Sequence, residues 1–409
     1  MTVRITKSEF NLREKISELD KPTGRKGLDL MRSETSQDAR DFISAGRKNK
    51  LFNGGMKINQ RGSSFTNVGS SANTFTLDRW KFYIQNSTAR FTVSKDSDSP
   101  DEFGGSMKIE CTTTDTSLAS TDEVYLEQRL EGQDVQDFAK GTRSAKEYTL
   151  SFYVKTNKLG TYIVNLLGRD NTTSTCSAAY TVNDTNWNRY TVTLPADASS
   201  SRKDNNDNGE ALRVLWWFVA GSAVNTTTLA TTWRNSTDTG RASGQINFAD
   251  STSNEFFLTG CQLEVGRNVT EFEHLSFAEE LALCQRYFQS NFPTGVAPQN
   301  GYYNANSGLA AGFNGAVCFS ANNLRSPWVM FRPKMNHQPD VTLYATSNND
   351  DDGKWAVYDH TGGWSSGSSN QIDYFGDQGF AVRFGGGGIS AVIGEAYLYR
   401  GNWTADAEL

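Results

Sequence analysis

The stretch Arg189-Tyr-Thr-Val-Thr-Leu194 alternates polar and apolar residues, whereas Arg213-Val-Leu-Trp-Trp-Phe-Val-Ala220 is apolar with hardly a break. Alternation predicts a strand with one face in a core and the other in water. The continuous run predicts a central strand that is covered on both sides. Similar runs recur from 51 to 274 between polar, turn-rich loops. This spacing favours a mainly β fold, with a jelly-roll-like antiparallel β-sandwich over 51–274.

Composition and charge indicate which kinds of molecule the protein can bind. The chain has 409 residues, 12% aromatic and 21% charged, which suits several β-rich domains better than a coiled coil. Its formal net charge is −6, yet residues 1–50 carry twelve Lys+Arg and eight Asp+Glu, a local +4 that leaves −10 on the remainder. An acidic body disfavours nucleic-acid binding. A basic arm on an acidic body indicates that the two parts meet different partners.

Cysteine usage and hydropathy indicate a chain made in a reducing cytoplasm. The five cysteines are an odd number with no C-x-x-C pair, so we expect small buried apolar residues rather than disulfides. The N-terminus lacks an apolar signal region, and the longest apolar run, 214–220, is too short to span a bilayer. We therefore expect neither standard secretion nor membrane insertion.

Two helical segments flank the predicted sandwich. In residues 1–50, the capping box Thr6-x-x-Glu9 precedes a narrow apolar stripe of Leu12, Ile16 and Leu19. Such a short helix needs a partner to bury its stripe, so we interpret 1–50 as an attachment arm, with a flexible tail as the alternative. Ser276-x-x-Glu279 opens a linking helix over 275–293, whose apolar face would comprise Phe277, Leu281, Cys284 and Phe288. A small Gly- and aromatic-rich β domain, the tip, follows over 294–409.

Several phrases resemble tail-fibre and virion-fibre proteins of bacteriophages, especially podophages of marine bacteria. They occur in the expected order: Asn53-Gly-Gly-Met-Lys-Ile-Asn-Gln-Arg-Gly, Leu77-Asp-Arg-Trp-Lys-Phe, Gln262-Leu-Glu-Val-Gly, Phe272-Glu-His and Glu279-Glu-Leu-Ala-Leu-Cys-Gln-Arg-Tyr-Phe. The resemblance covers most of residues 1–290, and the tip matches mainly at Phe331-Arg-Pro-Lys-Met and Trp403-Thr-Ala-Asp-Ala-Glu-Leu.

This resemblance implies a carbohydrate-module-like sandwich in a homotrimeric virion fibre that is assembled in the host cytoplasm. It also implies that residues 1–50 dock to phage tail or capsid proteins, and that the β domains bind a bacterial surface glycan or protein. A capsid-decorating fibre with a structural or adhesive role is the alternative. A polysaccharide-degrading enzyme is a weaker one, because no catalytic motif is present and we expect a non-enzyme.

Exposed aromatic rings in the tip are the candidates for glycan contacts, because their faces stack on the apolar faces of sugars. Trp364 lies in a Gly- and Ser-rich loop that cannot bury it through its own neighbours, so it is the foremost candidate for a ligand contact, with a contact between the subunits of a trimer as the alternative. The other candidates lie among Gly, Ser and Asp: Trp355, Tyr358, His360 and Tyr374.

A calcium site is a second hypothesis for the tip. Asn348-x-Asp350-x-Asp352-Gly353 places oxygen ligands at alternate positions before a glycine, and Asp359 stands at the twelfth position. Alternating Asp and Asn side chains can converge on one calcium ion, while Gly permits the sharp turn. A plain hairpin turn is the alternative, because Asp-Gly is a strong turn former. No cofactor is otherwise required.

Overall fold

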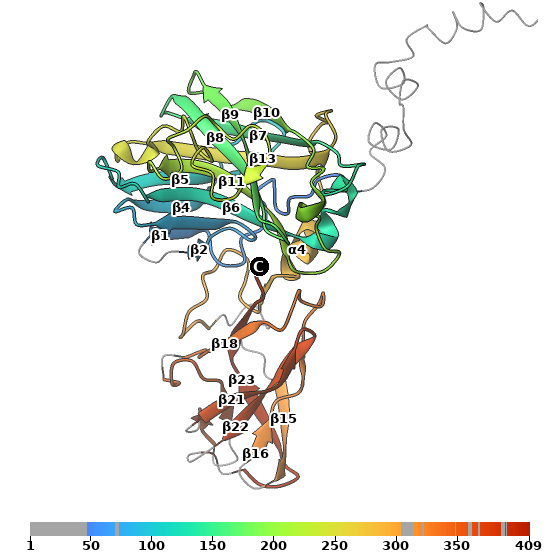
Figure 1. Cartoon of the computed structure of the whole chain (residues 1–409). Helices are drawn as coiled ribbons and strands as arrows, with labels where there is room; N and C mark the ends of the chain where they lie inside the picture. The colour runs from blue at the N-terminus through green and yellow to red at the C-terminus, as the bar shows by residue number, and fades with distance from the viewer. Residues whose placement is uncertain are drawn as a thin grey trace, which may run out of the picture. The chain divides into compact units, whose positions relative to one another are not determined.

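The computed structural model describes residues 47–69, 73–303, 314–320, 323–347, 349–358, 362–366, 369–385, 389 and 391–409. The architecture below is that of residues 49–409, the second of the two units into which the chain divides (Figure 1). The predicted anchor residues Leu12, Ile16 and Leu19 lie outside the described residues.

Two antiparallel sheets form the sandwich, as predicted (Figure 1). Sheet A has the strand order β1 (Ser64–Val68), β4 (Arg90–Asp96), β5 (Ser106–Thr113), β13 (Glu255–Val265), β7 (Tyr148–Thr156) and β10 (Asn188–Leu194). Sheet B has the order β12 (Arg234–Asn235), β9 (Ser174–Val182), β8 (Gly160–Gly168), β11 (Glu210–Ala220), β6 (Glu123–Glu131), β3 (Lys81–Gln85) and β2 (Asn73–Phe75).

Large aromatic rings from both sheets fill the space between them. Trp216 of β11 lies edge-on to Trp80 at 5.4 Å and to Phe152 of sheet A at 5.7 Å between ring centroids, and all three rings are buried. On its other face, β11 presents Leu215 and Trp217, and apolar residues of the following segment pack there: Val224, Leu229 and Ala242. The unbroken apolar run is thus explained, because β11 is covered on both faces.

The helix after the sandwich is shorter than predicted. Helix α4 spans Phe277–Gln285 and begins at the predicted capping box of Ser276 and Glu279. Its buried positions are Glu280, whose carboxylate accepts a hydrogen bond from Asn53 N, and Cys284. Phe277 is half exposed, and Phe288 is not helical but begins strand β14 (Phe288–Ser290). Pairing of β14 with a C-terminal strand outweighs the helical pattern there.

The described part of the tip contains two further antiparallel sheets. Sheet C has the order β14, β24 (Asn402–Asp406) and β18 (Asp340–Tyr344). Sheet D has the order β17 (Val329–Met330), β22 (Gly379–Gly385), β16 (Asn323–Arg325), β15 (Asn314–Ser320), β23 (Ala396–Arg400), β19 (Ala356–Tyr358) and β20 (Trp364–Ser365), and β21 (Ser369–Gly376) also pairs with β22.

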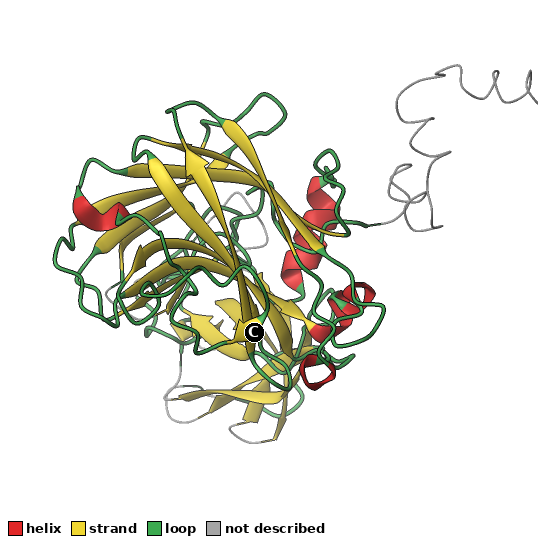
Figure 2. Ribbon diagram, turned by 45° about the horizontal axis from the view of Figure 1, so that its top comes forward, coloured by secondary structure: helices red, strands yellow, loops and turns green. Residues whose placement is uncertain are grey.

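Helical structure is sparse in the described residues (Figure 2). Besides α4, short 3-10 turns occur at Gly132–Asp134, Gln136–Phe138, Ser200–Arg202 and Phe248–Asp250. Among these residues, no helix combines the length and apolar character that a membrane span requires.

The last residues of the chain return from the tip to the sandwich. Arg79 forms a buried ion pair with Glu408, and Arg129 donates a hydrogen bond to the backbone oxygen of Leu409. Arg61 pairs with Asp406 through Nη1 and Oδ2 at 2.7 Å. These contacts join the edge of the sandwich to sheet C.

Candidate functional site

Trp355, which the sequence predicted as a glycan contact, belongs to the core of the tip. Its ring stacks on Tyr399 at 5.4 Å, and its Nε1 donates to the backbone oxygen of Asn402 at 2.8 Å. The side chain is 1% exposed, so its prediction as a glycan contact is wrong. Neighbours that are distant in sequence bury this ring, which local composition could not reveal.

Trp364 and Tyr358 form a pair on the neighbouring strands β20 and β19, with ring centroids 5.4 Å apart. The Arg400 guanidinium lies 4.1 Å from the Trp364 centroid, so one contact of this ring is already made within the tip. Tyr374 lies instead on β21 and contacts Arg325 of β16. His360 lies outside the described residues. The predicted aromatic residues therefore do not converge on one pocket.

The predicted calcium loop is engaged in an ion pair. The Asp350 carboxylate accepts hydrogen bonds from Arg400 Nη2 at 2.9 Å and Nε at 3.1 Å, and Asp352 is exposed. Asn348 and Asp359 are not among the described residues. Within the described ranges, no group of three or more His, Cys, Asp or Glu side chains is placed to hold a metal ion. Calcium binding by this loop stays a prediction.

The outer face of sheet B also carries aromatic rings, but they are closed off. Tyr83 stacks on Tyr125 at 4.6 Å, and Tyr125 lies 4.9 Å from Trp217. Tyr125 and Trp217 are buried, and residues 221–247 contribute the apolar side chains that pack against them. This face therefore offers little ring surface to a ligand.

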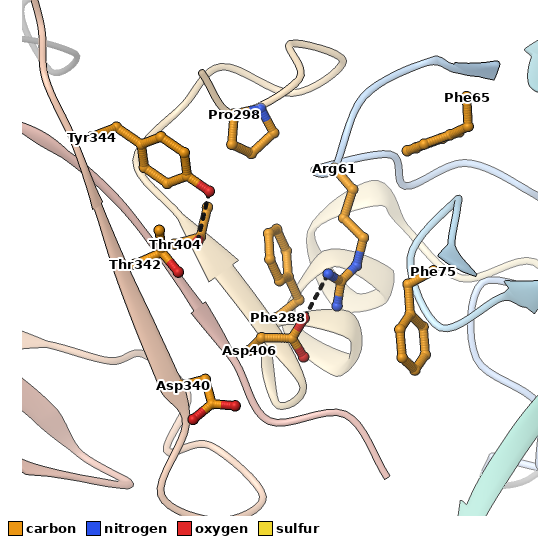
Figure 3. Close-up of a pocket in the computed structure, with 10 residues that line it drawn as sticks. All are labelled: Arg61, Phe65, Phe75, Phe288, Pro298, Asp340, Thr342, Tyr344, Thr404 and Asp406. Atoms are coloured by element: carbon orange, nitrogen blue, oxygen red, sulfur yellow. Dashed lines mark hydrogen bonds and ion pairs between the residues drawn. The ribbon is translucent and has the colours of Figure 1, made fainter. Parts of the chain in front are cut away.

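An open hollow lies where the edge of the sandwich meets sheet C, and we call it the cleft (Figure 3). Its volume is about 460 Å³. One wall carries side chains of the sandwich edge: Arg61, Phe65 and Phe75. The other wall carries Phe288, Pro298, Asp340, Thr342, Tyr344, Thr404 and Asp406.

Strand alternation explains how sheet C presents this second wall. Side chains two residues apart on a strand share a face, and residues paired across antiparallel strands point the same way. Asp340 pairs with Asp406, and Thr342 pairs with Thr404, so these four side chains share one face. The alternate residues of the same strands, Val341, Leu343, Trp403 and Ala405, pack into the core of the tip. The cleft wall is thus fixed by the register of sheet C.

The Arg61 side chain reaches across the cleft and contacts groups of both walls. Its guanidinium carbon lies 3.8 Å from the Phe288 ring centroid and 5.0 Å from that of Phe75. Burial alone would lower the pKa of Arg61, but the carboxylates of Asp406 and Glu408 outweigh burial and raise the pKa. Arg61 therefore stays charged and fixes the orientation of Asp406 in the cleft.

A buried carboxylate lies behind Arg61. Burial raises the pKa of Asp78 to about 6, although Arg61 and hydrogen bonds from Gln60 oppose that effect. The Gln60 backbone N and side-chain Nε2 both donate to Asp78, each at 2.6 Å. Asp78 thus interacts with the charge of Arg61, and its carboxyl group loses its proton near pH 6.

Chemically, the cleft offers aromatic surfaces next to hydrogen-bonding groups. Rings present apolar faces, and carboxylate and hydroxyl groups form hydrogen bonds with the hydroxyl groups of a ligand. Tyr344 and Thr404 hydroxyl oxygens are 3.5 Å apart, and Asp340 is exposed. This combination suits a polyhydroxylated ligand with apolar faces.

The sequence did not reveal the cleft, because its residues range from 61 to 406. One signal was available in the alternation Asp340-x-Thr342-x-Tyr344, which places polar and aromatic residues on one side of a strand. The partner strand shows the same alternation at Thr404 and Asp406. Which strands pair, and what lies opposite, is information that only the tertiary structure contains.

Comparisons with known proteins concern architecture. No protein-family model matches the chain, and no curated protein matches it in sequence. The enzymatically active domain of bacteriophage CBA120 tailspike protein 4 is similar at 11% identity and a TM-score of 0.28, over 53% of this chain and 21% of that chain. The match thus spans about a fifth of the tailspike domain's length.

Two carbohydrate-binding modules of Clostridium thermocellum are also similar over about half of the chain. A family 11 module, solved with a β-1,3-1,4-mixed-linked tetrasaccharide, has 12% identity and a TM-score of 0.25, over 52% of this chain and 97% of its own. The family 22 module of Xyn10B has 12% identity and a TM-score of 0.26, over 51% of this chain and 98% of its own.

Proposed function

We propose that this chain is a subunit of a bacteriophage virion fibre that binds a host surface glycan in the cleft. The observation that carries the glycan part is the cleft itself, where three aromatic rings of different strands surround carboxylate and hydroxyl groups: Phe65, Phe75 and Tyr344. The fibre part is supported by the sequence phrases that resemble phage fibres, and it is independent of the cleft.

Binding of the whole chain to an array of bacterial surface polysaccharides tests the glycan part. Loss of a stacking ring typically reduces affinity about tenfold, so Tyr344→Ala should weaken binding about tenfold without changing the melting temperature by more than a few degrees. Tyr303→Ala is the matched control, since its ring is half exposed and does not line the cleft. Equal binding by the wild type and Tyr344→Ala would overturn the cleft as the site.

The fibre assignment has its own test. A fibre homotrimer should have a solution mass near three times 45.2 kDa by light scattering. Deleting residues 1–50 should leave a folded body that no longer incorporates into particles, whether the mounting place is the tail or the capsid. A deleted chain that still incorporates would contradict the attachment role of this arm.

A polysaccharide hydrolase is the second candidate, because Asp340 and Asp406 pair directly across sheet C and both line the cleft. Two neighbouring carboxyl groups are what glycosidic cleavage requires. Release of reducing ends from host polysaccharide that Asp340→Asn abolishes would support it. Binding without release would leave the chain as a binding protein.

A further inference from the structure

A second surface of the tip has the make-up of a binding site, and it lies on sheet D. The buried residues Phe380, Val382 and Phe384 alternate along β22, so the residues between them point away from the core. The neighbouring strands place Arg325 beside Arg383, Asp373 beside Ala381, and Met330 beside Gly379. We call this outward surface the β22 face, formed by Arg325, Trp328, Met330, Asp373, Tyr374 and Arg383.

Tyr374 is held in a fixed position on this face. It lies in a β-bulge between Asp373 and Gly376 and has a φ of +49°, which is unfavourable for a residue with a side chain. Its hydroxyl accepts a hydrogen bond from Arg325 Nη1 at 2.8 Å, and the guanidinium carbon lies 4.5 Å from its ring centroid. The ring is nevertheless 65% exposed. The fold thus holds an exposed ring in place at a cost in backbone conformation.

Trp328 supplies a second ring over a floor of small residues. A Cβ added at Gly379 would lie 2.5 Å from Trp328 Nε1, so only glycine allows the indole to approach the strand this closely. Since β22 lies between β16 and β21, the Tyr374–Arg325 contact spans the outward side of β22 near Ala381. Two rings, nearly half or more exposed, therefore border a floor of glycine and alanine.

The charges beside the rings are predominantly positive. Asp373 Oδ2 lies 2.9 Å from Arg325 Nη2 and 3.3 Å from Arg383 Nε, so one carboxylate is shared by two guanidinium groups. The cluster has a formal charge of +1, whereas the cleft has one arginine and two aspartates, a formal −1. Planar guanidinium groups match carboxylates and phosphates in geometry. The two surfaces therefore suit ligands of different charge.

We infer that the β22 face binds an anionic sugar residue, with Trp328 and Tyr374 stacking on the sugar and Arg325 and Arg383 reading its carboxylate or phosphate. In a two-fold contact, a second copy would bring the same face and place like charges opposite each other, which disfavours that form of self-contact. This inference does not depend on the cleft, and either site can fail alone.

Calorimetric titration of the full chain with tetragalacturonate tests the inference. The probe's methyl ester retains the sugars and removes the charge, and galactose 6-phosphate replaces the carboxylate with phosphate. We expect tetragalacturonate or the phosphate to bind and the ester to bind at least tenfold more weakly. Arg383→Gln and Trp328→Ala should each weaken binding about tenfold at an unchanged melting temperature.

Two controls keep this test separate from the proposed function. Arg267→Gln removes an exposed arginine of the sandwich that is paired with Glu147, and it should leave binding of the anionic sugar unchanged. Tyr344→Ala in the cleft should also leave it unchanged, so failure of one site does not imply failure of the other.

Three outcomes would overturn the inference. The first is no binding of either anionic probe at millimolar concentration. The second is equal binding by the wild type, Arg383→Gln and Trp328→Ala. The third is self-association that Trp328→Ala abolishes, because that would assign the β22 face to contact between copies of the chain.

Discussion

The sandwich and the tip differ in how many of their large apolar side chains are exposed. In the sandwich, the rings of Trp80 and Trp216 pack between two sheets and are buried. Most large apolar side chains that are exposed in the described residues lie instead after residue 300: Tyr303, Trp328, Met330, Tyr358, Tyr374, Phe375, Val392, Ile393 and Leu398. The comparison indicates that the sandwich covers its large apolar side chains more fully than the tip does, and exposed apolar groups that cluster are where interaction sites are sought.

Layering gives the physical reason for this difference. Both sheets of the sandwich turn one face to a common core, and residues 221–247 add cover on the outer side of sheet B. Sheet D also turns one face to a core, formed by residues such as Phe380 and Tyr399. Its outward rings, including Trp328 and Tyr374, have no second described layer over them. They remain available to a ligand.

The largest expected effect is the loss of stability when a buried ring of the sandwich is removed, compared with an exposed ring of the tip. Trp216→Ala removes a ring from the centre of the sandwich, so it should lower the free energy of unfolding by about 3–5 kcal/mol. Trp328→Ala in the tip should lower it by less than about 1 kcal/mol, because the ring is already nearly half exposed. Urea denaturation of both variants measures the two effects. Equal losses would mean that the tip ring is structural.

An effect of intermediate size concerns the pH dependence of stability that Asp78 causes where the sandwich meets the tip. The folded state holds the Asp78 proton more tightly than the unfolded chain, since its pKa is about 6 instead of 3.8. Its contribution to stability is therefore complete below about pH 4 and is lost as pH rises through 6, a change of about 3 kcal/mol. Asp78→Asn should lack this change. Unfolding free energies at pH 4 and pH 7 should thus show a steeper loss for the wild type; parallel behaviour would contradict the assignment.

The smallest expected effect concerns the aromatic pair that the sequence indicated first. Trp364→Ala should change stability by less than about 1 kcal/mol, because the side chain is only partly buried, and it should weaken attachment to host cells if the ring contacts a receptor. Cell binding and melting temperature, measured together, check both statements. A large loss of stability would assign Trp364 to packing with Arg400 and Tyr358.

The sequence by itself determined the mainly β fold, because the period of apolar residues in stretches such as 189–194 and 213–220 is set by strand geometry. It also located the start of α4, since a capping box is a local interaction between Ser276 and Glu279. It could not place the end of that helix, because Phe288 has a helical spacing but pairs with Asp406 far along the chain.

Only the tertiary structure decided the sites. Trp355 and Tyr374 lie in similar Gly-, Ser- and Asp-rich surroundings in sequence, yet one ring is buried against Tyr399 and the other is exposed. The cleft likewise exists because the register of sheet C places Asp340 beside Asp406, opposite Arg61 of the sandwich edge. Burial and convergence depend on contacts between residues tens to hundreds of positions apart, whereas periodicity and capping depend on neighbours a few residues away.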